Sequence, residues 1–173
     1  MGKMFFSIVF IILISCTSNE ENVTEISRYD LPDQQSWNST IILTREGRKR
    51  AVIKSGHLVK YNDRKEIILD DNVDADFFSM EEKHLSNLKS RKALIYEATD
   101  NMLAIGNVVV VSNSGVTLYT DSLLWDNVAG QVITEDSVML TTEGGDTLYG
   151  TGFKSNVDLT HWKIYHPWGV TGR

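Results

Sequence analysis

The chain has 173 residues, of which 42% are hydrophobic and 23% are charged, and its formal net charge is −6 at pH 7. This length suits one domain with a sizeable core, and the composition excludes a disordered or fibrous chain. The negative charge, with no basic stripe in the sequence, argues against nucleic acid as a partner.

The first fifteen residues have the pattern of a signal peptide. One positive charge at Lys3 precedes the apolar run Phe5–Ile14, which is too short to span a bilayer comfortably but suits a signal-peptide core. The run ends in Leu-Ile-Ser-Cys at 13–16, which resembles the bacterial lipobox. Ser15 supplies the small side chain before the cleavage point, and Cys16 would carry the lipid. The alternative is an accidental cysteine at the end of an apolar helix.

Cys16 is the only cysteine of the chain, so the sequence excludes an internal disulfide and a cysteine-based zinc site. Two or three acyl chains, at roughly 0.8 kcal/mol per buried methylene, would hold the protein on a membrane almost permanently. The residues after Cys16 are polar and acidic. We therefore expect a signal peptide over 1–15, a flexible tether over 16–31 and a β-domain over 32–173.

From Ser36 onward, the apolar residues alternate with a period of two, which predicts β-strands. The expected strands are rich in Val, Ile, Leu, Thr and Tyr, and include Thr40–Thr44, Arg50–Lys54, Glu66–Leu69, Asn107–Ser112, Val116–Tyr119 and Ser137–Thr141. Turns are expected at Glu46-Gly47, Asn62-Asp63, Asn113–Gly115, Asn127–Gly130 and Glu143–Gly145. Only Phe77–Lys92 could hold a helical turn, and its Lys83–Lys92 portion could equally be a strand.

The sequence also repeats itself at an interval of thirty residues, which is the length of two to three strands. The interval relates Leu88, Leu118 and Leu148, then Ala93, Leu123 and Phe153, and also Ile95 and Trp125. One such unit cannot bury its apolar face alone, so we expect stacked layers around a continuous apolar interior. A V-shaped pair of sheets, a jelly roll and a β-solenoid all fit.

A stacked sheet that does not close leaves unpaired N–H and C=O groups at its first and last strands. Here those strands are expected near Ser36–Thr44 and Leu159–Tyr165. Such edges aggregate, are capped, or accept a strand from a partner.

Strand parity predicts which residues face the interior. Leu118 and Leu123 have opposite parity within one stretch, so we expect a β-bulge near Asp121-Ser122. The interior positions are either plain core or, in an open upper part of the interior, contacts for an acyl chain. The candidates for this lipid groove are Val108, Val110, Leu118, Leu123, Trp125, Val138, Leu140 and Leu148.

No motif for catalysis or for a cofactor occurs. The sequence has no Gly-x-Ser-x-Gly, P-loop or Gly-x-Gly-x-x-Gly motif, and its four histidines do not have metal-ligand spacing. Asp70–Asp76 with Glu81 places ligand-type residues at calcium-loop positions 1, 3, 5, 7 and 12. However, Ala75 stands where the sharp turn needs glycine, so a solvated acidic turn is favoured. We expect a non-enzymatic protein without a metal or cofactor.

Several segments together resemble the LptC family of lipopolysaccharide export proteins. Pro32–Trp37 resembles the start of the domain in the lipid-anchored branch of that family. Gly106–Val110 and Leu118–Asp126 resemble its central repeat, shared with LptA-type proteins, and Leu148–Asn156 and Trp162–Ile164 resemble its C-terminal unit. The resemblance runs from about 32 to 166.

The resemblance implies a twisted, open β-jelly roll with an apolar groove between two sheets. It implies a protein at the periplasmic face of the inner membrane that takes lipopolysaccharide from the LptB/LptF/LptG ABC transporter and passes it to an LptA-like bridge. The lipobox by itself is also compatible with anchoring at the outer membrane. The N-terminal edge would join the transporter and the C-terminal edge the bridge. The candidate partner-edge residues are Trp37, Ile41, Leu43, Phe153, Trp162 and Ile164.

Two other readings compete with lipid transport. The first is an envelope lipoprotein that only scaffolds other proteins and has a closed, dry core. The second is a periplasmic hydrolase or carbohydrate-binding protein, which would need a polar pocket, and the expected strands offer no clustered carboxylates.

Overall fold

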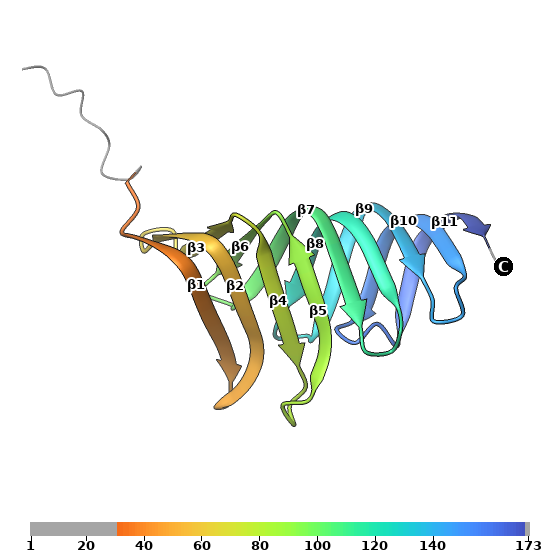
Figure 1. The fold of residues 1–173 in the computed structure, drawn as a ribbon, viewed down its shortest axis with the longest axis horizontal. Coiled ribbons are helices and arrows are strands. Elements are labelled where there is room, and N and C mark those ends of the chain that lie inside the picture. Colours follow the sequence, from red (N-terminus) through yellow and green to blue (C-terminus); the bar gives the residue numbers. More distant parts are fainter. Residues whose placement is uncertain (1–30, 172–173) are drawn as a thin grey trace, which may run out of the picture.

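The computed structural model describes residues 31–171, and they form a single antiparallel sheet of eleven strands (Figure 1). The strands are β1 (Gln34–Arg45), β2 (Arg48–Tyr61), β3 (Glu66–Asp70), β4 (Val73–Phe78), β5 (His84–Ser90), β6 (Lys92–Tyr96), β7 (Asn101–Ser112), β8 (Thr117–Asp126), β9 (Gln131–Thr141), β10 (Thr147–Asn156) and β11 (Trp162–Thr171). The expected signal peptide, the anchor Cys16 and the expected tether up to residue 30 lie outside the described residues. Within 31–171, no helix has the length and hydropathy of a membrane span.

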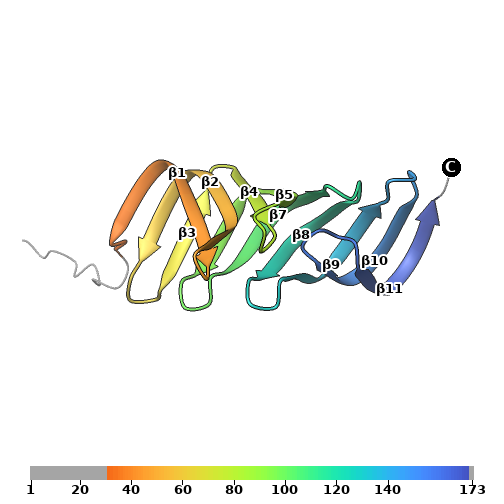
Figure 2. The same ribbon diagram turned by 90° about the horizontal axis from the view of Figure 1, so that it is seen from below.

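The sheet is a meander of long strands, two of which each consist of two shorter strands placed end to end. β3 and β4 together form one long strand beside β2, and β5 and β6 together form the next, so that β7 pairs with β6 along its first half and with β5 along its second. Figures 1 and 2 show the strands as successive rungs along the long axis, with β1 at one end and β11 at the other. Among the described strands, β1 and β11 are therefore the two edges.

A line of irregularities crosses the sheet and divides it into two limbs. The register shifts between Ile105 and Val108 where β7 meets β8, between Thr120 and Leu124 where β8 meets β9, and between Thr151 and Phe153 in β10. Such bulges bend a strand and reverse which side chains face inward. The bulge expected at Asp121-Ser122 is confirmed, and Leu118 and Leu123 consequently face the same interior.

We call the two halves limb A and limb B. Limb A contains β3, β6 and the parts of the long strands that lie on the same side of the bulges as β3 and β6. Limb B contains β4, β5 and the parts of the long strands on the other side of the bulges. Gly106, with φ of +82°, lies at the bend of β7, and a Cβ atom there would meet the Arg91 side chain at 2.5 Å. The positive φ therefore favours glycine at this point, and an added Cβ atom would also displace the flexible end of the Arg91 side chain.

The thirty-residue repeat corresponds to rows of residues that cross the sheet from strand to strand. In limb B, one row of paired residues runs through Ile41, Ile53, Ala75, Leu88, Val110, Leu118, Leu140, Leu148 and Val170. Two antiparallel long strands and their turns take up thirty residues, so Leu88, Leu118 and Leu148 recur on every second strand of this row. The sequence repeat is one hairpin of the meander.

The segment with the ambiguous prediction contains no helix. Phe77–Lys92 forms the end of β4, a turn, all of β5 and the start of β6. The turn is closed by backbone hydrogen bonds between Ser79 and Lys83 and from Glu82 to Ser79. The strand alternative for this segment is therefore the correct one.

Candidate functional site

The candidate groove residues come together between the two limbs. Val108, Val110, Leu118, Val138, Leu140 and Leu148 line limb B, while Leu123 and Trp125 line limb A. Seven of them are at most 3% exposed, and Leu148 is half-buried. Strand parity and the repeat therefore placed these residues on the inner side of the sheet, where the structure has them. Their contact with lipid stays a prediction.

Side chains from the two limbs meet in the middle of the interior. The rings of Phe77 on β4 and Trp125 on β8 lie with centroids 4.8 Å apart, and both residues are 1% exposed. The indole Nε1 of Trp125 is buried without a hydrogen-bond partner. An acyl chain can enter here only if the limbs separate, because a close-packed interior has no room for added atoms.

The side opposite the bend, which we call the mouth, is bridged near its C-terminal end by the loop between β10 and β11 (Figure 2). Ser86 Oγ donates to the carbonyl of Val157 at 2.7 Å, and Ser114 Oγ donates to that of Asp158 at 3.1 Å. Leu159, at 0% exposure, is inserted into the core from this loop. The sequence had suggested Leu159 as the start of the last strand, but that strand begins at Trp162.

A second bridge crosses the mouth nearer the N-terminal end. Arg45 Nη1, at the tip of limb B, donates to the carbonyls of Asn127 at 3.3 Å and Val128 at 2.9 Å in the β8–β9 turn of limb A. Neither bridge was expected, since each joins segments far apart in the chain through backbone acceptors that carry no sequence signal.

The partner-edge candidates are not all at an edge. Trp37 on β1 is 66% exposed, whereas Ile41 is half-buried and Leu43 is buried at 9%. Phe153 is fully buried on β10, one strand in from the edge, because it pairs with Thr134 on one side and Ile164 on the other. Its substitution would therefore alter the core rather than the edge.

Trp162 and Ile164 lie on the edge strand β11 and pack, partly buried, against the core. Together with Val170, which is 67% exposed, they continue the interior rows onto the last strand. The apolar interior is thus sealed in the middle of the molecule and partly exposed at its C-terminal end.

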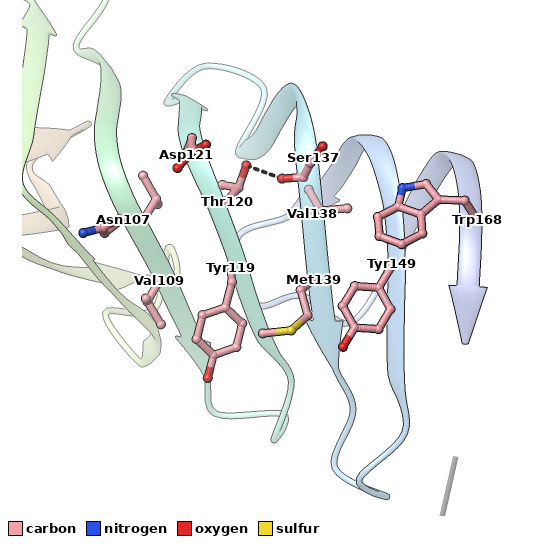
Figure 3. A pocket seen from close by; sticks show the side chains of 11 residues that line it. Asn107, Val109, Tyr119, Thr120, Asp121, Ser137, Val138, Met139, Tyr149 and Trp168 are labelled. Atoms are coloured by element: carbon pink, nitrogen blue, oxygen red, sulfur yellow. Dashed lines mark hydrogen bonds between the residues drawn. The ribbon is translucent and has the colours of Figure 1, made fainter. Parts of the chain in front are cut away.

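The outer face of limb B carries an aromatic pocket that the sequence reasoning missed (Figure 3). It has a volume of about 370 Å³, and Tyr119, Met139, Tyr149 and Trp168 line it. The rings of Tyr149 and Trp168 are stacked at 5.3 Å. The sequence does contain a signal for this pocket. The apolar residues Val109, Tyr119, Met139 and Tyr149 have the opposite parity from the core residues, and they pair with one another across β7 to β10.

A sequence model of the family described as lipopolysaccharide-assembly, LptC-related, matches residues 4–167, nearly the whole chain. The chain belongs to the LptC-related family. Its fold is similar to the crystal structure of LptH, the LptA-homologous periplasmic component of the lipopolysaccharide transport device from Pseudomonas aeruginosa. That match has a TM-score of 0.54 and 8% sequence identity, and covers 66% of this chain and 80% of LptH. No curated protein matches the chain.

Membership of the LptC-related family gives the chain a role in lipopolysaccharide transport, and the likeness to LptH confirms the expected all-β jelly-roll architecture. Within residues 31–171, no three His, Cys, Asp or Glu side chains cluster as metal ligands. The segment weighed as a calcium loop is instead extended: Asp70 ends β3, Asp71 and Asn72 form the bend, and Asp74 and Asp76 lie along β4.

Asp76 is held in its charged form on limb B. Burial raises the pKa of Asp76, but hydrogen bonds from Asn87 and His84, with the charges of His84 and Lys54, outweigh burial and hold this pKa below its ordinary value of 3.8. The contacts to Asn87 and His84 measure 2.9 and 3.1 Å. These interactions join β4 to β5, so the carboxylate stabilises the strand pairing.

Proposed function

We propose that this LptC-related chain receives lipopolysaccharide from an LptB/LptF/LptG-type ABC transporter, holds its acyl chains between the two limbs, and passes it to an LptA-like bridge. The observation that carries the proposal is the apolar row of limb B, which crosses every long strand from Ile41 to Val170. An unbroken row from edge to edge would provide a path for an acyl chain along the whole sheet once the limbs separate. Burial of methylenes along it would supply the binding free energy.

The two edge strands support the second half of the proposal. β1 pairs only with β2, and β11 pairs only with β10, so each leaves a row of free backbone groups within the described sheet. A partner strand added to β11 would extend the sheet and the interior rows at once. Because Trp162 and Ile164 are partly buried on β11, they would become fully buried by such an addition.

We place the protein at the periplasmic face of the inner membrane, held by a lipid on Cys16. The lipobox at 13–16 supports the anchor, and the family supports the envelope location. The fold supports a transport role without a chemical step, since the protein needs only to present apolar surface along a path. Replacement of Cys16 by Ala should release the protein from membranes, and retention in the membrane fraction would contradict the anchor.

The bridged mouth favours a second candidate, an envelope scaffold with a permanently closed core. The two candidates differ in whether lipid reaches the interior. A photo-crosslinking residue at Leu148, half-buried on the inner side of β10, should capture lipopolysaccharide in cells. The same residue at the neighbouring Tyr149, on the outer face, is the matched control and should capture none. If Leu148 captures no lipopolysaccharide while partners still bind, the scaffold is correct.

A further inference from the structure

A buried arginine at the mouth makes no ion pair with any residue of the described part of the chain. Arg50 is only 9% exposed, and its Nε atom is buried without a hydrogen-bond partner. Its side chain takes part in none of the ion pairs among residues 31–171. A buried charge is normally paired, because removal of an ion from water costs several kcal/mol that only a partner offsets.

Arg50 lines a pocket of about 340 Å³ between the tips of the two limbs. The β1–β2 hairpin contributes Arg45, Glu46 and Arg50, the β4–β5 turn contributes Met80, and the β8–β9 turn contributes Asn127–Gly130. Two arginines thus face one glutamate, so the lining is net positive. Arg45 bonds backbone carbonyls and not Glu46, so its charge also lacks a carboxylate partner in the described part of the chain.

The residues of this pocket follow closely in the chain after the residues through which the two limbs touch. Met80 follows Phe77 by three residues and Asn127 follows Trp125 by two, and the rings of Phe77 and Trp125 contact each other between the limbs. A lipid whose acyl chains lay between the limbs would therefore leave its headgroup at this pocket. The planar guanidinium suits the oxygens of a phosphate group, with which it forms two parallel charge-assisted hydrogen bonds.

We propose that the pocket of Arg45, Arg50 and Asn127 at the mouth binds a phosphate group of the lipopolysaccharide headgroup, with Arg50 as its main ligand. This inference rests on the proposed function. It assigns Arg50 a role that the strand pattern alone would not require, since a buried side chain at such a position would ordinarily be apolar. Free phosphate has the same chemistry, but the position at the mouth favours a phosphate that is attached to acyl chains.

The test compares lipid A that carries its phosphates with dephosphorylated lipid A, using the full chain in detergent. Arg50→Gln should weaken binding of the phosphorylated form by about tenfold or more and leave the dephosphorylated form unchanged. Arg64→Gln, which removes an exposed arginine from the β2–β3 turn, is the control and should change neither. If Arg50→Gln binds the phosphorylated form like wild type, the phosphate site is wrong. If wild type binds neither form, the proposed lipid transport fails as well.

Two further measurements separate a binding role from a structural one. Arg50→Met should raise the melting temperature of the lipid-free protein, because it removes an unpaired buried charge, and should still weaken binding of phosphorylated lipid A. A lower melting temperature would make Arg50 a structural residue and overturn the site. Inorganic phosphate alone should not shift the melting temperature of wild type. A shift that is lost in Arg50→Gln would assign the pocket to free phosphate and overturn the lipid assignment.

Discussion

The middle and the C-terminal end of the molecule carry the same inward-facing rows but differ in exposure. Leu118 and Leu140 on β8 and β9 are 0% exposed, whereas Val170, in register with them on β11, is 67% exposed. The difference arises because inner strands have a neighbour on both sides and the edge strand has one. The limbs must therefore separate in the middle of the molecule to accept a ligand. At the C-terminal end, the free edge of β11 can pair with a strand of another sheet without such a change.

The largest expected difference between the two regions is in stability. Trp125→Ala should lower the free energy of unfolding by about 3–5 kcal/mol, because it leaves a large cavity against Phe77. Trp168→Ala, at a 66% exposed position on the edge strand, should lower it by less than about 1 kcal/mol. Urea unfolding of both variants measures the contrast, and equal losses would mean that the middle is not the rigid part of the interior.

An inward-pointing charge on the edge strand β11 should abolish partner binding while lowering the stability of the protein only slightly. Ile164→Lys should cost about 1 kcal/mol or somewhat more, but it should abolish association with an LptA-like partner, because charges that point inward block strand addition. Tyr165→Lys, at the adjoining and exposed position, is the matched control and should retain association. Co-purification reports the outcome, and association of the Ile164 variant would contradict a β11 interface.

The smallest expected effect is the pH dependence that arises from Asp76. Its lowered pKa means that its contribution to stability is present above the ordinary value of 3.8 and is lost as the pH falls through the folded value. The contribution should be below about 1 kcal/mol, because the contact is partly exposed. Melting temperatures measured as the pH falls from about 5 toward 3 should drop less for Asp76→Asn than for wild type. Asp121→Asn should behave like wild type.

The sequence predicted the sheet better than it predicted the mouth. The interval that relates Leu88, Leu118 and Leu148 indicated stacked hairpins, since an apolar row repeats in the sequence when each hairpin has the same length. The parity conflict between Leu118 and Leu123 indicated the bulge. Both signals are local and periodic, and signals of this kind can be recognised in a single sequence without an alignment.

The bridges and the buried arginine could not be predicted in this way. Leu159 enters the core from a loop with φ of +54°, outside any strand period, and its loop is held by serines more than forty residues away. The β1–β2 pairing shifts register between Leu43 and Thr44, and Arg50 lies on β2 opposite this shift. Its parity in the sequence therefore gave no reason to expect its side chain to be buried. Long-range contacts and register shifts determine these positions, and only the folded arrangement shows them.

The central claim is that lipopolysaccharide lies between the limbs and therefore separates them. Spin labels at Lys83, at the tip of limb B, and Ala129, at the tip of limb A, would report the width of the mouth in a Cys16→Ser variant. We expect the distance between these labels to increase when lipopolysaccharide is added, while the distance in a control pair at Lys83 and Lys89, both on limb B, stays constant. Bound lipopolysaccharide with an unchanged distance across the mouth would contradict a position of the lipid between the limbs.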